Sequence, residues 1–410
     1  MDGRGIGRRI AYWRERRRLT QADFGALMGQ SRRWVQDLES GARQADPRLS
    51  VLESAAHVLQ VRMDVLLADE PNAECIDAVE LATIRVTLQR YDVLTGSPDP
   101  GLRPPLAPGE LRRRVAHGWA AFQVGHFASL GRVVPELLIE ANRAAAQLEG
   151  DDQRAAFRAL SMTLQLIEAA GIKYGDTELA MTAAHRAVTA AERSENALIV
   201  GSAARRMSEA MTHHGQAPAA AAFAVAAADR LERTVPQRDD DGLSVLGMLY
   251  LKAAMAAAAA IANDTPTAVA ATPELFDRAA EHADCLGRDD NRLWTAYGPT
   301  NVALHRVAAH VQLSEGADAI AVSETIPAAA RDALPRERRA HFLTDLALAY
   351  GQAGRREKAV DTLLAAEREA AEEVTCRPRT KQLVENLRLL GVGNAEGRLI
   401  SLAKRCGLPG

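Results

Sequence analysis

Residues 32–40 carry long polar side chains on one side of a predicted helix and apolar side chains on the other. With 3.6 residues per turn, Val35 and Leu38 fall on one side, flanked by Trp34. The opposite side carries side chains that form hydrogen bonds: Arg32, Arg33, Gln36, Asp37 and Ser40. A short helix with one apolar edge and several hydrogen-bonding side chains suits the major groove of DNA.

A second short helix is predicted immediately before this one, between Thr20 and Gly29. Thr20 can cap its N-terminus, and Gly29 lies where the chain can turn sharply. Ser31 can cap the following helix, and Gly41 can end that helix in a left-handed conformation. Two short helices joined by a tight turn predict a helix-turn-helix.

Three further helices are predicted around this pair, over residues 6–18, from about residue 49 to 59, and over 61–67. The first contains six arginines: Arg8, Arg9, Arg14, Arg16, Arg17 and Arg18. The apolar positions that mark the first and the fourth helix are Ile6, Ile10, Trp13, Leu49, Leu52, Ala56 and Leu59.

Residues 6–67 resemble the five-helix DNA-binding domain of the lambda-repressor-like, XRE-type regulators. The matching residues are Thr20-Gln21, Gly29, Ser31, Val35, Leu38-Glu39 and Gly41. The resemblance implies that Gln21 touches a phosphate or a base beside Ser31, and that Arg32, Arg33, Gln36 and Asp37 face base edges or the flanking backbone. It also implies that Glu39 pairs with Arg14 inside the domain. Gly25 departs from the alanine usual in the family, and glycine costs roughly 1 kcal/mol in a helix.

The positive charge of the chain is concentrated at its N-terminus. Residues 1–48 contain eleven arginines and six acidic residues, which gives +5, whereas the whole chain carries −3. Phosphate binding requires such an excess of positive charge. The alternative is a small helical domain that binds no DNA, because exposed arginines are common and helix-turn-helix units also dock proteins.

The bulk composition indicates a large helical protein. A chain of 410 residues predicts two or more domains. It is 47% hydrophobic but only 4% aromatic, so its core must consist mostly of alanine, leucine and valine, which favours packed helices over a sheet. Only five of the 50 basic residues are lysine, which indicates a GC-rich genome such as that of an actinobacterium.

Several features indicate a cytoplasmic protein. The four cysteines are scattered without metal-binding spacing: Cys75, Cys285, Cys376 and Cys406. The arginine-rich N-terminus lacks the apolar run of a secretory signal. The most apolar segment, residues 253–262, is too short to span a membrane.

The chain beyond residue 70 is predicted to be entirely helical, so the fold class is all-α. We expect a DNA-binding domain over residues 1–70, a connecting helix (73–94) and a proline-rich linker within 71–108, and a helical-repeat domain over 109–410. Helices in the last domain break at Gly150, Gly175, Gly215, Pro236, residues 263–273, Gly287, Gly316, Pro335 and Gly354.

These breaks are periodic, and the residues around them have the spacing of tetratricopeptide repeats. One unit contains Leu346-Ala347, Tyr350, Gly354, Ala359, Leu363 and Ala366, and similar spacing follows Ile167 and Met207. The region therefore resembles a tetratricopeptide-like α-solenoid, and with the N-terminal domain it resembles a class of bacterial regulators that includes peptide-sensing members. Such solenoids bind peptides or small ligands in a groove and commonly dimerise.

Residues 291–305 are the candidate ligand site. Trp294 and Tyr297 precede Gly298-Pro299, and Asn301 and His305 share one face of the helix that follows. An asparagine amide can both donate to and accept from a peptide backbone. The alternative is structural: Gly298-Pro299 starts a helix, the aromatic residues belong to the core, and Asn301 caps the turn.

No catalytic, metal-binding or phosphate-loop motif is present in the sequence, so we expect no enzyme, metal or cofactor. The leading hypothesis is a homodimeric, sequence-specific DNA-binding transcriptional regulator that senses a small molecule or peptide. The alternative is a protein-interaction adaptor with weak, non-specific affinity for DNA.

Overall fold

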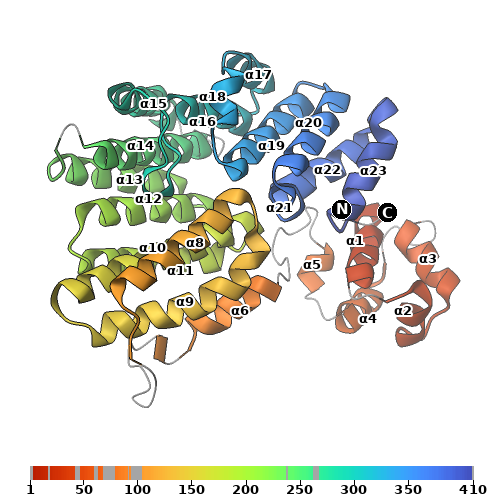
Figure 1. Cartoon of the computed structure of the whole chain (residues 1–410). Helices are drawn as coiled ribbons and strands as arrows, with labels where there is room; N and C mark the ends of the chain where they lie inside the picture. Colours follow the sequence, from red (N-terminus) through yellow and green to blue (C-terminus); the bar gives the residue numbers. More distant parts are fainter. Residues whose placement is uncertain are drawn as a thin grey trace. The chain divides into compact units, whose positions relative to one another are not determined.

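The protein is all-helical. The computed structural model describes residues 3–16, 19–41, 47–59, 63–67, 79–90, 92–93, 104–236, 239–261 and 267–408 (Figure 1). Within these ranges every named element is a helix, and the isolated β-bridge joins Asp290 to Tyr297. The predicted fold class is therefore confirmed.

The chain divides into two compact units. One comprises residues 1–75 and 378–410, and the other comprises residues 76–377. The sequence analysis assigned residues 378–410 to the repeat domain, whereas the structure groups them with the N-terminal residues. The domain boundaries at residues 70 and 108 remain a prediction.

The first unit begins with five helices, as the sequence predicts. They are α1 (Gly3–Arg16), α2 (Gln21–Leu27), α3 (Arg32–Ser40), α4 (Leu49–Leu59) and α5 (Met63–Leu67). Their shared core is built from the predicted apolar positions, among them Ile6, Ile10, Trp13, Val35, Leu38, Leu52 and Leu59. The C-terminal part of this unit consists of α22 (Pro378–Leu390), the short η2 (Gly393–Ala395) and α23 (Glu396–Arg405).

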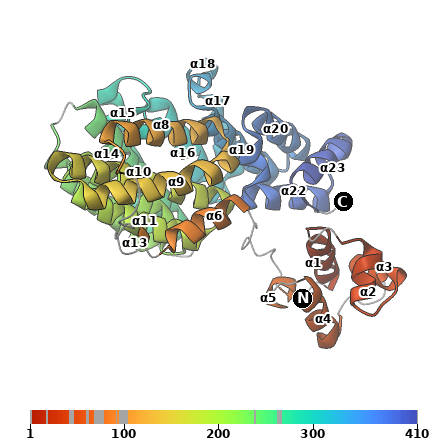
Figure 2. The ribbon, with the colours of Figure 1, turned by 60° about the horizontal axis from the view of Figure 1, so that its bottom comes forward.

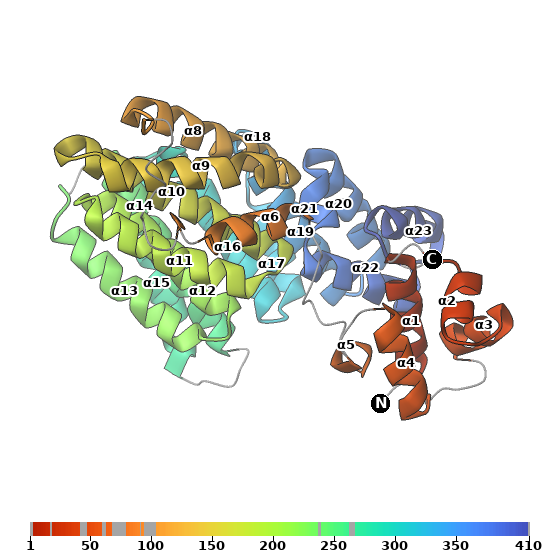
Figure 3. The same ribbon diagram turned by 90° about the horizontal axis from the view of Figure 1, so that it is seen from below.

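The second unit contains five successive antiparallel helix pairs. They are α10 (Gly150–Tyr174) with α11 (Thr177–Arg193), α12 (Ala197–His213) with α13 (Ala217–Glu232), α14 (Asp240–Ile261) with α15 (Thr267–Leu286), α16 (Pro299–Gln312) with α17 (Gly316–Glu324), and α19 (Arg336–Gln352) with α20 (Arg356–Glu369). The first helices of successive pairs pack on one another, from α10 through α12, α14 and α16 to α19. Figure 3 shows α10, α11, α12 and α13 side by side, and Figure 2 shows α10, α11 and α13 from another direction.

Small residues at the repeat positions allow the helices of this array to approach closely. Of the alanines and leucines that the repeat spacing assigns to the second helix of a pair, Ala227 is half-buried and the others are buried: Ala180, Ala184, Ala187, Ala220, Ala224, Ala359, Leu363 and Ala366. The predicted breaks at Gly175, Gly215 and Gly354 coincide with helix ends. The tetratricopeptide-like organisation is therefore present.

Three segments flank the array. These helices are α6 (Val79–Leu88), α8 (Pro108–Val124) and α9 (Phe127–Gln147), and they precede the array in the chain. Three short helices lie in connections later in the chain: η1 (Arg292–Trp294), α18 (Ala328–Asp332) and α21 (Ala371–Thr375). α8 packs against α9, α10 and α19, so it links an early helix pair to the last one.

Two predicted segments differ in the structure. Residues 73–78, 91 and 94 of the expected helix over 73–94 lie outside the described residues. α6 ends at Leu88, whose carbonyl accepts a hydrogen bond from Arg186 Nη1 at 2.8 Å. The expected break over residues 263–273 is shorter, because α15 begins at Thr267 and continues through Pro273. Pro273 lies inside this helix, beyond its first turn, where a proline removes one backbone hydrogen bond of the helix.

α14 is long and apolar enough to cross a membrane, by length and composition. However, 83% of its apolar window is buried among the neighbouring helices. It therefore has the properties of a core helix.

The centre of α14 lies against the ring of Tyr297. A Cβ atom on Gly247 would overlap the Cζ and hydroxyl oxygen atoms of this tyrosine. Tyr297 is itself fully buried, and its hydroxyl donates to the Ala279 carbonyl. The absence of a side chain at residue 247 therefore sets how closely α14 and the 290–298 connection pack.

We expect Gly247→Ala to destabilise the second unit by about 1–3 kcal/mol, the usual cost of overpacking a core. Thermal or urea unfolding of the full chain measures this change. Gly109→Ala is the matched control, because a Cβ at that position in α8 meets no atom within 4 Å and alanine favours a helix. Equal stability of the two variants would contradict the proposed packing constraint.

Candidate nucleic-acid interface and ligand site

Both helices of the helix-turn-helix begin with a side-chain cap. The Thr20 hydroxyl accepts a hydrogen bond from the Asp23 backbone N–H at 3.1 Å, and the Asp23 carboxylate accepts one from the Thr20 backbone N–H at 3.1 Å. The Ser31 hydroxyl accepts from the Trp34 backbone N–H at 3.2 Å. Gly41 follows α3 with φ +68°, in the left-handed region. The predicted caps of α2 and α3 are therefore confirmed.

The turn between α2 and α3 gives Gly25 a structural role. The Gln30 N–H donates to the Gly25 carbonyl at 2.7 Å, and a Cβ on Gly25 would lie 2.8 Å from the Gln30 carbonyl oxygen. The glycine therefore permits a close turn here, which offsets its low helix propensity.

α3 has one buried edge and one exposed face. Val35, Leu38 and Glu39 are buried, whereas Arg32, Arg33 and Gln36 are exposed. Asp37 is half-buried and Ser40 is exposed. The buried edge fixes the helix in the domain core, and the exposed face presents two guanidinium groups and a carboxamide to solvent.

A buried polar network connects α1, α2 and α3. Arg14 donates from Nε and Nη2 to the two carboxylate oxygens of Glu39, the latter bond being 3.1 Å, and from Nη1 to the Leu19 carbonyl at 2.9 Å. Gln21 Nε2 donates to Glu39 Oε2 at 2.8 Å. The predicted Arg14–Glu39 pair is therefore present. It also orients Gln21, a candidate DNA contact, at the first residue of α2.

The four candidate ligand residues occupy different environments. Tyr297 is a core residue, and burial raises the pKa of its hydroxyl. Asn301 and His305 are buried on α16, where His305 Nδ1 lies 2.9 Å from the Asn301 carbonyl oxygen. Burial lowers the pKa of His305 well below its usual value, so its imidazole is neutral at pH 7. Trp294 is half-buried, with its ring centroid 6.4 Å from that of Trp119 on α8.

Two of these residues have polar atoms without a hydrogen-bond partner among the described residues. They are the indole Nε1 of Trp294 and the amide Oδ1 of Asn301. The connection that carries Trp294 is also strained, since Leu293, Trp294 and Ala296 have φ values of +48°, +57° and +48°. Backbone strain in non-glycine residues occurs often at functional sites.

The structure adds a set of buried charges that the sequence analysis did not identify. Most of them lie on the first helices of the pairs, and one group surrounds Lys173 of α10 and includes Glu373 of α21. Lys173 Nζ donates to Glu373 Oε1 at 3.0 Å and to Glu337, and it lies 3.2 Å from His341 Nδ1. Glu337, His341 and Glu373 each have a side-chain atom that could bind a metal ion, and these three atoms lie within 4.8 Å of one another. The same three side chains are in contact with the Lys173 ammonium group.

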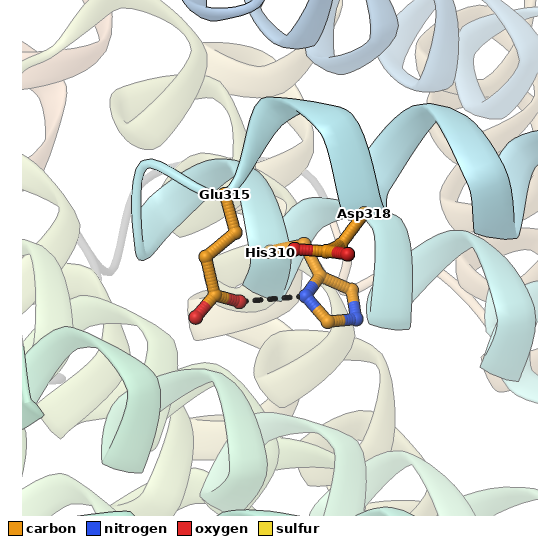
Figure 4. A group of neighbouring side chains, drawn as sticks. All are labelled: His310, Glu315 and Asp318. Carbon is orange, nitrogen blue, oxygen red and sulfur yellow. Dashed lines mark hydrogen bonds and ion pairs between the residues drawn. The ribbon is translucent and has the colours of Figure 1, made fainter.

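A second group of metal-ligand residues lies at the α16–α17 turn (Figure 4). His310 Nδ1 is 2.7 Å from Glu315 Oε2, and Asp318 is next to this pair. His310 is half-exposed and both acidic residues are exposed, so this is a solvent-facing ion pair that closes the turn. Cys285 is exposed, Cys376 is half-buried and Cys406 is buried, whereas Cys75 lies outside the described residues.

Comparison with known proteins identifies the N-terminal domain. Residues 6–69 match the model of a helix-turn-helix domain family. Together with the geometry of α2 and α3, this shows that the chain carries an N-terminal helix-turn-helix domain, a DNA-binding fold, ahead of a helical-repeat region.

Two further comparisons cover the whole chain. The comparison with curated proteins found no match. Among solved structures, the chain is similar to Bacillus thuringiensis PlcR in complex with the peptide PapR7 and DNA. The identity is 14%, the TM-score is 0.30, and the match covers 69% of this chain and 95% of that one.

We expect Glu39→Ala to destabilise the helix-turn-helix domain by about 3–5 kcal/mol, because it leaves the Arg14 charge buried and unpaired. Hydrogen exchange of the α1–α3 amides measures the change. Glu53→Ala is the matched control, since Glu53 is exposed on α4 and its loss costs less than about 0.5 kcal/mol. Equal protection of the α1–α3 amides from hydrogen exchange in both variants would show that the Arg14–Glu39 pair does not stabilise the domain.

Proposed function

We propose that the protein is a homodimeric, cytoplasmic transcriptional regulator that binds specific DNA sequences through α3. The observation that carries this proposal is the division of α3 into a buried apolar edge and a face that exposes Arg32, Arg33 and Gln36. A helix of this kind, capped and fixed by its core, can enter the major groove with its polar face toward the bases.

Each candidate DNA contact has a role that follows from its chemistry and position. Arg32 and Arg33 can bind guanine edges or phosphates, and Gln36 can pair with adenine. Gln21 and Ser31 lie at the N-termini of α2 and α3, where the helix dipoles favour a phosphate. Asp37 is half-buried beside these candidate DNA contacts, where its carboxylate would disfavour some bases or orient a neighbouring arginine. The +5 charge of residues 1–48 supports binding to the DNA backbone.

The helical-repeat region serves, in this proposal, as the dimerisation and sensing part of the regulator. Two helix-turn-helix domains would read half-sites one or more helical turns apart, each turn being ~34 Å. A small molecule or peptide bound near Trp294, Asn301 and His305 would change the spacing of the two domains. Tyr297 would hold the adjacent backbone in place rather than touch the ligand, because it is enclosed in the core. The proposal includes no catalytic activity.

We expect Arg33→Ala to reduce affinity for a preferred DNA site by about 1–3 kcal/mol and to relax base preference at one position of each half-site. Quantitative binding to a set of single-base variants measures both effects. Arg48→Ala is the control within the same domain, since Arg48 is exposed outside α3 and its loss should weaken binding to all sequences alike. Unchanged base preference in Arg33→Ala would remove Arg33 from the base-reading set.

A further inference from the structure

The first helices of the pairs, called the inner helices below, include α12, which carries a buried arginine with two guanidinium nitrogens that lack hydrogen-bond partners among the described residues. Arg205 of α12 is 2% exposed, and its Nε and Nη2 atoms have no hydrogen-bond partner among the described residues. The neighbouring Arg206 is 8% exposed, and its Nε is also unpartnered within the described part of the chain. Buried donors of this kind are rare in folded proteins, because losing hydration without a replacement partner is costly.

The nearby carboxylates do not satisfy these donors. Glu209 already accepts from Arg206 Nη1 at 3.0 Å and from Lys252 Nζ at 2.7 Å. Glu168 is fully buried, neither of its carboxyl oxygens accepts a hydrogen bond from a described residue, and its closest ion-pair distance to Arg206 Nη1 is 3.4 Å. The donors of Arg205 are therefore unmatched by the acidic groups around them.

The charge balance of this region is positive. Arg205, Arg206 and Lys252 face two carboxyl groups, those of Glu168 and Glu209. Burial raises the pKa of Glu168 to about 8 against the opposing effect of Arg206, so this carboxyl group is largely neutral near pH 7. Burial lowers the pKa of Arg205 to about 9, which leaves its guanidinium charged at the same pH. With Glu168 neutral, the three basic groups face one ionised carboxylate, that of Glu209, so three positive charges and one negative charge give +2, and a bound anion would reduce this excess.

The same region is covered by α8 and by the strained connection after α15. The Arg206 guanidinium lies 5.2 Å from the centroid of the Trp119 ring, and Trp119 Nε1 donates to the Met162 carbonyl at 3.2 Å. Gln123 of α8 and Asn291 exchange two side-chain hydrogen bonds, of 2.9 and 2.8 Å. An extended peptide would have to displace these contacts to reach the two arginines.

We propose that Arg205 and Arg206 form a binding site for the carboxylate or phosphate group of a small molecule enclosed between α8 and the inner helices α10 and α12. Guanidinium groups bind both anions through paired, charge-assisted hydrogen bonds. The unpartnered atoms of Trp294 and Asn301 supply a donor and an acceptor for the rest of the molecule. This proposal deepens the sensing role proposed above and rests on it for its consequence, but the binding itself can be tested separately.

The test uses the purified full-length protein with inorganic phosphate and acetate as probes. Thermal unfolding is followed in each anion and in chloride at equal pH and ionic strength. We expect phosphate or acetate to raise the unfolding temperature of the wild type by about 2–5 °C at saturation. A response to phosphate alone indicates a phosphate ester as the ligand, and a response to acetate alone indicates a carboxylic acid.

Arg205→Met should abolish this anion-specific shift, and in chloride it should unfold at the same or a higher temperature, because it removes a buried, unpaired charge. Arg132→Met is the matched control, since Arg132 is exposed on α9, and it should keep the full shift. Should Arg205→Met fail to fold, Arg205→Lys retains the charge but loses the paired donors, and it should weaken phosphate or acetate binding about tenfold.

Two results would overturn the anion site: no specific stabilisation of the wild type by either anion, or an equal shift in the wild type and Arg205→Met. DNA selection by the same preparation separates this outcome from the proposed function. Protein that selects a DNA sequence but ignores both anions refutes the anion site alone. Protein that responds to the anions but selects no DNA supports the anion site and counts against the regulator.

Discussion

Close contact between helices at alanine and glycine positions is the constraint on which both units depend. A chain with only 4% aromatic residues cannot fill wide gaps between helices, so its helices must approach closely. In the repeat array, buried alanines such as Ala184 and Ala224 provide this approach, and Gly247 receives the ring of Tyr297. In the helix-turn-helix, Gly25 does the same for the turn before α3. Close packing at small residues therefore positions both α3 and the first helices of the array.

This packing has opposite consequences for charged residues in the two units. In the helix-turn-helix, the buried pair of Arg14 and Glu39 is hydrogen-bonded, and the two arginines of α3 are exposed. In the repeat array, ionisable groups of the inner helices are enclosed, and two nitrogens of Arg205 and both carboxyl oxygens of Glu168 have no hydrogen-bond partner among the described residues. The first arrangement suits a surface that binds a large polyanion from solvent, and the second suits a small ligand.

The sequence predicts local features of this structure well. The caps at Thr20 and Ser31, the end of α3 at Gly41 and the repeat alanines follow from residue type and short-range spacing, because capping and helix periodicity act over a few residues. Features that depend on distant residues were not predictable in this way. The Leu88 carbonyl at the end of α6 is bound by Arg186, 98 residues away, and the core position of Tyr297 depends on Gly247. The burial of Arg205 depends on several helices at once, and the pair Arg205-Arg206 in the sequence gives no sign of it.

The central claim is that α3 reads a specific DNA sequence as part of a dimer. The most direct measurement is selection of genomic DNA fragments by the purified full-length protein, followed by sequencing of the retained fragments and by repetition at higher salt. We predict enrichment of an inverted repeat whose half-sites are separated by a whole number of helical turns, each about 10–10.5 base pairs. Retention of fragments without any shared sequence, lost steeply as salt increases, would contradict the claim and indicate binding to the phosphate backbone alone.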